Sequence, residues 1–255
     1  MSETIMSETK KQKKVFAFTA AIIAACAAVV LLLIFVIIPT VKYHRNLAAI
    51  QKDGTVTFGH YEQDNDTSNG KEEIEWQVLV IQDGKALVIS TMALDCKSYH
   101  PSPKEVTWET CTLRTWLNDS FLNTAFSAKE QKKIATTHVS AEKNPAYDPA
   151  YKSNPGNATN DKVFLLSITE AEKYFTTDES RECVPTAYAQ AHGAYTNDYE
   201  TANGKANCCW WLRSPGKVLF QAASVDHVGA VGYGGSSVNA DSSCIRPAMW
   251  IDLKK

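Results

Sequence analysis

The sequence lacks the short motifs that mark common hydrolases and nucleotide-binding proteins. No Gly-x-Ser-x-Gly elbow, His-Glu-x-x-His pair or glycine-rich phosphate loop occurs in its 255 residues, although each depends on a fixed local spacing. Neither a Cys-x-x-Cys pair nor a histidine at ligand spacing from two cysteines is present, which excludes the usual zinc patterns. We therefore predict no catalytic residue, no metal and no cofactor, and classify the chain as a non-enzyme.

Positive charge is scarce beyond the N-terminal part of the chain. Six of the 26 basic and two of the 28 acidic residues lie among residues 1–45, which leaves 20 basic and 26 acidic residues for the rest. Binding to a phosphate backbone depends on clustered lysine and arginine. We therefore expect no nucleic-acid partner.

Charge is absent from the 24 residues Val15 to Ile38, where Thr19 is the one clearly polar residue. A helix of this length rises ~1.5 Å per residue and spans ~36 Å, enough to cross a bilayer with some tilt. The segment predicts one transmembrane helix with the lipid bilayer as its partner. Pro39 follows and predicts an end or a kink, because proline lacks the backbone N–H.

Flanking charges predict the orientation of this helix. Four lysines among residues 10–14 precede it, whereas only Lys42 and Arg45 follow it, and basic residues favour the cytoplasmic side. The chain is accordingly divided into a cytoplasmic tail, a transmembrane helix, a stalk and an extracellular domain, at residues 1–14, 15–38, 39–54 and 55–255.

Two other forms of N-terminal processing stay open. Ile23-Ala24-Ala25-Cys26 resembles a bacterial lipidation box, so Cys26 is a candidate for lipid attachment. A cleaved signal peptide is the second alternative, although its apolar core is usually shorter and ends at a small-residue site. Under each of the three interpretations the domain reaches the outer face of the membrane.

The remaining residues predict strands, then short helices, then strands again. Asp83-Gly84 between two apolar runs is a strong hairpin signal, and Ser127 with Glu130 is a capping box that opens a helix. The predicted strands are 55–58, 74–81, 85–92, 163–166, 209–213, 218–225, 229–233 and 245–253, with a turn at 232–237. Because no βαβ alternation occurs, the pattern favours an α+β fold with an antiparallel sheet and short helices.

Six cysteines lie in the predicted extracellular domain: Cys96, Cys111, Cys183, Cys208, Cys209 and Cys244. An even number in that setting favours disulfides, with fifteen possible pairings. Adjacent Cys208 and Cys209 point to opposite faces if they lie on a strand, so they serve different partners or one stays free. Residues 64–66 offer the carboxylates of a calcium loop, but their spacing matches no known calcium motif.

Two segments near the C-terminus combine tryptophan with arginine, at residues 209–216 and 245–251. A buried arginine needs a carboxylate or several carbonyls for its five donors. An internal arginine network that locks the terminal strands is therefore the favoured interpretation. The functional alternative is a recognition surface for sugars or peptides, formed by Trp210, Trp211, Arg213, Arg246 and Trp250.

Four ordered blocks carry a family resemblance. They are Trp108 to Asn118 with Phe121 and Ala125 to Ser127, Asp161 to Ser167 with Glu170 and Tyr174-Phe175, Trp210 to Gly216, and Arg246 to Trp250. Together they resemble the bacterial domain-of-unknown-function 6273 family over residues 55–253.

The resemblance implies no established activity. The closing Trp-Leu-Arg-Ser and Arg-Pro-Ala elements are similar to the C-type-lectin-like fold of sulfatase-modifying-factor relatives and of retroelement-diversified receptors. The cysteine pattern of the formylglycine-generating enzymes is not recognisable, so that activity is not implied. Family members have cysteine at the positions of Cys96 and Cys183, which implies a disulfide between them, with Cys111 paired to Cys244 or Cys208.

These observations lead to three functional hypotheses. The first is a lectin-like module at the bacterial cell surface that binds cell-wall glycans or surface proteins. The second is an enzyme acting on the cell envelope, with acidic residues from the loop at 142–161 or from Asp226. The third is a structural or regulatory subunit of a membrane assembly, which would be marked by a large exposed apolar patch.

Overall fold

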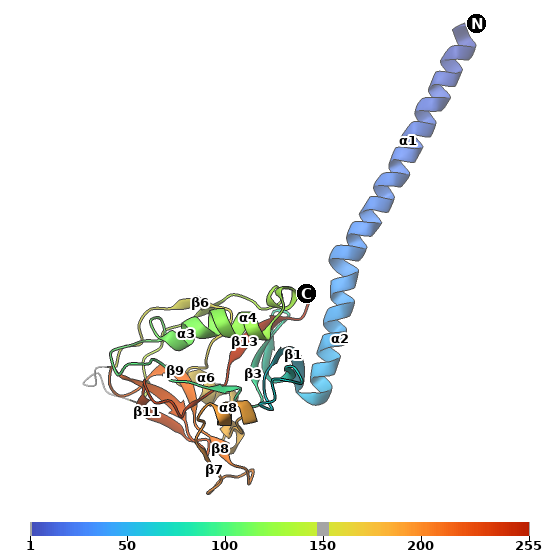
Figure 1. Ribbon diagram of the computed structural model, residues 1–255. Coiled ribbons are helices and arrows are strands. Elements are labelled where there is room, and N and C mark those ends of the chain that lie inside the picture. Colours follow the sequence, from blue (N-terminus) through green and yellow to red (C-terminus); the bar gives the residue numbers. More distant parts are fainter. Residues whose placement is uncertain (1, 147–152, 255) are drawn as a thin grey trace. The chain divides into compact units, whose positions relative to one another are not determined.

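The computed structural model describes residues 2–146 and 153–254 and divides the chain into two units. An N-terminal helical unit extends to Ala48, and a compact unit runs from Ala49 to Leu253 (Figure 1). The compact unit contains short helices and mostly antiparallel sheets. The predicted α+β class is therefore confirmed.

The N-terminal unit is a continuous helix built from α1 (Ser2–Leu32), the π-helical turn η1 (Leu33–Ile37) and α2 (Ile38–Asp53). The stretch Lys13–Ala48 is long and apolar enough to cross a membrane.

Pro39 does not end this helix. In a regular α-helix its ring would collide with the carbonyl four residues earlier. The π turn lies at this point and widens the backbone: the Ile38 N–H bonds the carbonyl oxygen of Leu33, five residues back.

Gly54 ends α2, at the last residue of the predicted stalk 39–54. Its φ is +68°, and its N–H donates to the Ile50 carbonyl oxygen at 2.7 Å. A left-handed residue directly after a helix satisfies a terminal carbonyl in this way, and glycine adopts that conformation without a steric penalty.

The first sheet is four-stranded and fully antiparallel, in the order β1-β2-β3-β13. Its strands are β1 (Thr55–Tyr61), β2 (Glu72–Gln82), β3 (Lys85–Ser90) and β13 (Ala248–Asp252). The β2–β3 hairpin turns at Asp83 and Gly84, which both have positive φ, +53° and +77°. Two such residues form the tight turn whose twist matches a hairpin, and this prediction is confirmed.

The second sheet has five strands in the order β11-β10-β9-β12-β4; β9 and β11 are labelled in Figure 1. They are β4 (Asp95–Cys96), β9 (Trp210–Pro215), β10 (Gln221–Val225), β11 (Val231–Ser237) and β12 (Cys244–Ile245). The β12–β9 pair is parallel, and the other pairs are antiparallel. Two small antiparallel sheets pair β5 (Thr137–Val139) with β6 (Thr159–Asp161), and β7 (Thr196–Asn197) with β8 (Asn207–Cys208).

Short helices connect these strands. They are α3 (Thr112–Trp116), η2 (Leu117–Phe121), α4 (Leu122–Ala125), α5 (Ala128–Gln131), α6 (Ile168–Tyr174), α7 (Asp178–Arg181) and α8 (Ala187–Ala191). The predicted capping box at Ser127 and Glu130 is present and opens α5. A second box of the same kind, Ser167 with Glu170, opens α6. Each box satisfies backbone N–H groups at a helix start.

Three predicted elements differ in the structure. Residues 163–166 are buried but form only a single bridge, from Phe164 to Ala248. The Asn118 side chain replaces a neighbouring strand at Val163, because its oxygen accepts the Val163 N–H at 3.2 Å and its amide donates to the Val163 carbonyl at 2.8 Å. The predicted strand 245–253 is split into β12 and β13 around Pro247, which has no N–H to contribute.

The glycine-rich stretch 232–237 is a strand and not the predicted turn. Gly235 has a φ of +74°, and a Cβ there would lie 2.4 Å from the Ala222 carbonyl oxygen. The glycine therefore permits close approach of β11 to β10. In the predicted loop 142–161, the described residues 142–146 and 153–158 form no helix or strand, and residues 147–152 lie outside the described part of the chain.

Candidate functional site

The Trp250 side chain is the predicted site residue that reaches the surface. It lies on β13, opposite Leu87 of β3. Its neighbours Met249 and Ile251 are buried, whereas Trp250 is half-buried. Successive side chains of a strand point to opposite faces, so β13 directs Met249 and Ile251 into the core and Trp250 outward.

A chain segment from the middle of the sequence pairs with the free edge of β13. Ala135 donates its N–H to the Trp250 carbonyl oxygen at 2.9 Å, and Asp252 donates to the Lys133 carbonyl at 2.8 Å. This pairing places residues 135–138 beside the indole. The β2–β3 hairpin end supplies the opposite wall.

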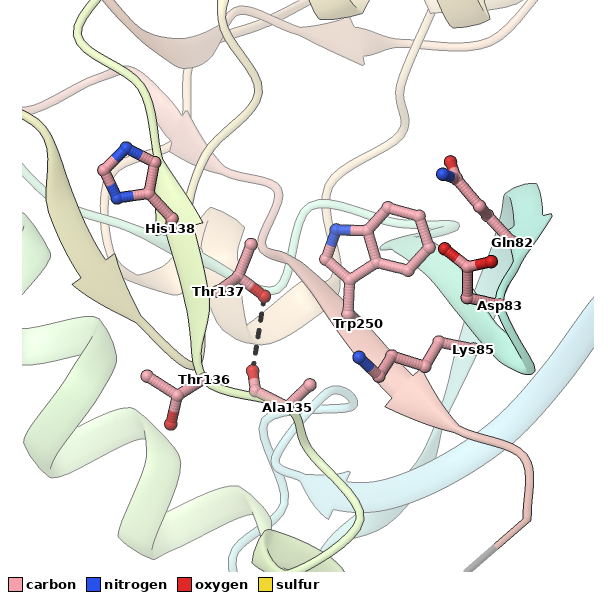
Figure 2. Close-up of a pocket in the computed structure, with 8 residues that line it drawn as sticks. All are labelled: Gln82, Asp83, Lys85, Ala135, Thr136, Thr137, His138 and Trp250. Carbon is pink, nitrogen blue, oxygen red and sulfur yellow. Dashed lines mark hydrogen bonds between the residues drawn. The ribbon is translucent and has the colours of Figure 1, made fainter.

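Together these walls form a pocket of about 290 Å³ around the indole. Figure 2 shows Trp250 at its centre, with the hairpin residues on one side and the segment leading into β5 on the other. The lining residues are Gln82, Asp83, Lys85, Ala135, Thr136, Thr137, His138 and Trp250. The Thr137 hydroxyl is aimed at the Ala135 carbonyl oxygen, at 3.4 Å.

The pocket combines one broad apolar surface with several hydrogen-bonding groups. Gln82, Asp83, Lys85 and His138 are exposed to solvent and offer an amide, a carboxylate, an ammonium and an imidazole. Small-ligand sites typically pair an apolar wall with a few placed polar groups. The arrangement suits a small polar ligand that has one apolar face.

The other four residues of the predicted recognition surface are buried, so they do not form such a surface. They are Trp210, Trp211, Arg213 and Arg246. Trp210 and Trp211 are fully buried. They are consecutive on β9 and so point to opposite faces of the sheet, where Arg246 lies over Trp210 and Tyr99 packs on Trp211. Their indole N–H groups donate to main-chain carbonyls, of Arg181 at 3.1 Å and of Lys97 at 3.0 Å. Each buried donor is thus satisfied within the fold.

Arg213 forms the internal network that the sequence favours. Its side chain is 5% exposed and pairs with both carboxylate oxygens of Glu170. It also donates to the carbonyl oxygens of Leu165 at 3.0 Å and Ser140 at 3.4 Å. The network joins β9, the start of α6 and the loop after β5.

Arg246 is buried without a carboxylate partner. It is 3% exposed, and it forms no ion pair with any residue that the structure describes. Its Nε donates to the Ser90 carbonyl oxygen at 2.8 Å. Its guanidinium lies over the rings of Phe175 and Trp210, 5.1 and 5.2 Å from their centroids. Aromatic faces attract a cation that has lost its water.

The cysteine predictions are not met. All seven cysteines are free thiols, so neither the expected Cys96–Cys183 bridge nor one at Cys111 is formed. Cys96 lies directly opposite Cys244 in the β4–β12 pair, and Cys208 donates its N–H to the Cys183 carbonyl at 2.9 Å.

Cys111 has a structural position of its own. Its sulfur accepts the Arg114 N–H at 3.4 Å and caps α3. Burial raises the pKa of this thiol to about 12, because a thiolate is poorly solvated in the core. Cys209 is half-buried and Cys26 is exposed on α1.

Glu142 and Asp226, two acidic residues of the envelope-enzyme hypothesis, form hydrogen bonds within the fold. Glu142 accepts from the hydroxyls of Ser140 at 2.8 Å and Ser167 at 3.2 Å. Burial raises its pKa, but hydrogen bonds from Ser140 and Thr169 and the Arg213 charge outweigh burial and lower it. Asp226 accepts the N–H groups of Val228 and Ala230 in the β10–β11 turn.

The comparisons with known proteins identify a family. A family model described as "Domain of unknown function (DUF6273)" matches residues 83–253, more than half of the 255-residue chain. The chain belongs to this family. The DUF6273 match begins later than the resemblance at residue 55 suggests, so β1 and all of β2 precede it, although they share a sheet with β3 and β13. No curated protein and no solved structure matches the sequence significantly.

Of the residues that line this pocket, the sequence interpretation named only Trp250. Lys85 and Asp83 lie at a hairpin that was recognised only as a turn, and His138 is more than 100 positions from Trp250 in the sequence. The predicted hairpin did contain a usable signal. The charged residues Asp83 and Lys85 lie in or directly after its turn, and a hairpin turn lies at the end of its two strands, where side chains reach the solvent. The pairing of residues 133–135 with β13 had no sequence signal.

Proposed function

We propose that this DUF6273 protein is a membrane-anchored binding protein and that its Trp250 pocket takes a sugar ring of a cell-wall glycan. One observation carries the proposal: a half-exposed indole is surrounded by amide, hydroxyl, carboxylate, ammonium and imidazole groups. A sugar ring has an apolar face of C–H groups, which packs on an aromatic ring, and hydroxyls at its rim, which bind polar side chains.

The size of the pocket limits the ligand. Its volume of about 290 Å³ is at the lower end for small-molecule sites. One sugar residue, or the end of a chain, fits such a site better than an extended polymer segment. Affinity for one ring in an open site is modest, so avidity from a repeating wall polymer supports the function.

The N-terminal helix supports a membrane anchor. Residues 13–48 are apolar and long enough to span a bilayer, and the lysines at residues 10–14 favour a cytoplasmic N-terminus. In this proposal the compact unit lies outside the cell, next to the wall. The α+β order and the antiparallel sheets are consistent with the C-type-lectin-like arrangement that the resemblance implies.

The two alternatives have less support. Among the described residues of the envelope-enzyme hypothesis, Glu142 and Asp226 are held by hydrogen bonds, which makes them less suited to act as catalytic acids. In the described part of the compact unit, large apolar side chains are strongly exposed only at Tyr195, Tyr199 and Phe220. That gives little surface for a permanent subunit contact.

Glycan binding by the full chain tests the proposal. The protein is purified in a non-ionic detergent and titrated with soluble fragments of peptidoglycan and teichoic acid and with neutral oligosaccharides, with calorimetry as the readout. We expect saturable binding to one of these classes and a loss of affinity of about tenfold or more in Trp250→Ala. Trp116→Ala is the matched control, because Trp116 is also half-buried but lies outside the pocket.

Two outcomes contradict the proposal: binding to none of the glycans, or equal affinity in Trp250→Ala and wild type. The topology is tested separately by treating intact cells with a membrane-impermeant amine reagent. Labelling of Lys85 and Lys217 without labelling of the lysines at 10–14 is expected, and the reverse pattern overturns the outside location.

A further inference from the structure

Three carboxylates meet where the first strand of the compact unit leads into the second. Glu62 directly follows β1, Asp64 lies in the connecting loop, and Glu72 opens β2. One oxygen of each lies within 4.8 Å of the others. None of the three pairs with a basic side chain among the described residues. Three like charges in contact repel one another unless a cation or a proton is present.

The loop fixes two of these carboxylates. Asp64 accepts the Asp66 N–H at 2.8 Å and the Asn69 amide at 2.7 Å. Glu72 accepts the N–H of Gln63 at 2.6 Å and that of Asp64 at 3.4 Å. The oxygens are therefore held in place before any ligand binds, which lowers the cost of binding.

Glu62 supplies an independent observation. Its side chain is only 8% exposed, and its Oε1 is buried without any hydrogen-bond partner. A buried carboxylate oxygen without a partner is costly, so native proteins rarely retain one unless something else binds it.

We infer that Glu62, Asp64 and Glu72 bind a divalent cation, and that calcium is the preferred ion. Calcium takes six to eight oxygen ligands from carboxylates, carbonyls and water, in a flexible geometry. Magnesium demands a near-ideal octahedron and keeps most of its water, so a cluster of three protein carboxylates favours calcium. The bound ion supplies the partner that the Glu62 Oε1 lacks.

Calcium at this position fixes the β1–β2 connection to the rest of the compact unit. The Gln63 carbonyl oxygen accepts the Tyr188 N–H of α8 at 3.0 Å, and Tyr61 donates to Asp95 of β4 at 2.7 Å. The site thus lies at a junction between the two main sheets. It precedes residue 83, where the family match begins, and it is separate from the Trp250 pocket.

Calcium titration of the full chain tests this site. The protein in non-ionic detergent is stripped of metal and titrated with CaCl₂ and with MgCl₂ by calorimetry. We expect one calcium ion per chain and weaker binding of magnesium. Glu62→Gln and Asp64→Asn should each weaken calcium binding by about tenfold or more, since each removes a charged ligand. Glu73→Gln should leave it unchanged, because Glu73 is an exposed neighbour on the same strand that points to the other face.

The variants keep the shapes of the replaced side chains, and circular dichroism reports whether they fold. If Glu62→Gln does not fold, the calcium affinity of Asp64→Asn provides the test. Absence of calcium binding, or equal binding in Glu62→Gln or Asp64→Asn and wild type, overturns the site. Tighter binding of magnesium than of calcium overturns the calcium assignment.

Discussion

Strand β9 and the segment around β13 contain the same residue types, yet the fold uses them differently. Both place arginine in an apolar run with tryptophan. Strand β9 is internal to its sheet and buries Trp210 and Trp211, whereas β13 lies at the end of the four-stranded order and leaves Trp250 half-exposed. The packing on each strand's faces, and not composition, decides which tryptophan reaches the surface.

The two arginines differ in a second way. Arg213 is neutralised by Glu170, while Arg246 relies on the Ser90 carbonyl and two aromatic rings. A buried guanidinium therefore has two solutions in this protein. The two solutions differ in energetic consequence. Removal of the Glu170 carboxylate leaves the buried charge of Arg213 unpaired, whereas removal of Arg246 leaves no unpaired carboxylate behind.

The largest expected effect separates the two tryptophans. Trp210→Ala should lower the free energy of unfolding by ~3–5 kcal/mol, because it opens a large cavity in the core. Trp250→Ala should lower it by less, ~2 kcal/mol or below, since Trp250 is only half-buried and lines an open pocket. Urea unfolding of the full chain in detergent, followed by circular dichroism, measures both. Equal losses would show that Trp250 belongs to the core and would remove the basis for the pocket.

A smaller effect tests the Arg213–Glu170 pair. Glu170→Gln keeps a side chain that can cap α6 but removes the charge opposite buried Arg213. We expect a loss of ~2 kcal/mol, less than for a fully buried pair because the Glu170 side chain is 28% exposed. Glu130→Gln in the matching box of α5 is the control, since Glu130 caps a helix in the same way without an arginine partner. Similar losses in both variants would show that capping, and not the ion pair, matters at Glu170.

The smallest effect is expected at Arg246. Arg246→Met keeps the packing volume and removes a cation that has no carboxylate partner, so the free energy of unfolding should stay within ~1 kcal/mol of wild type. Thermal and urea unfolding in the same detergent provide the measurement. If this variant loses more stability than Glu170→Gln does, Arg246 is held by an anion, and the contrast between the two arginines fails.

Local patterns in the sequence predicted local structure well. The Asp83-Gly84 turn, the Ser127–Glu130 capping box and the end of the helix at Gly54 all depend on residues within four positions of one another. Errors arose where a distant chain segment replaced a local solution. Val163 uses the Asn118 side chain in place of a strand neighbour, and the glycines of β11 allow close packing against β10 where a turn was expected.

The cysteines illustrate the same limit. Their even number and their place beyond an apolar helix predicted disulfides, but pairing depends on distances that no sequence pattern contains. The fold sets Cys96 opposite Cys244 in the β4–β12 pair, and none of the cysteines forms a disulfide. The number of thiols therefore predicted disulfides, but the tertiary arrangement forms neither the Cys96–Cys183 bridge nor one at Cys111.

By itself the sequence determined the long apolar helix, the α+β class, the family and the need of Arg213 for a partner, because periodicity, turn chemistry and charge burial act locally or on composition. Only the tertiary structure decided that Glu170 is that partner. It also decided that Trp210 and Trp211 lie in the core while Trp250 reaches the surface, and that residues 135–138 complete the Trp250 pocket. It also brought Glu62, Asp64 and Glu72 together. These outcomes depend on contacts between segments far apart in the chain, which are selected by packing of the whole unit.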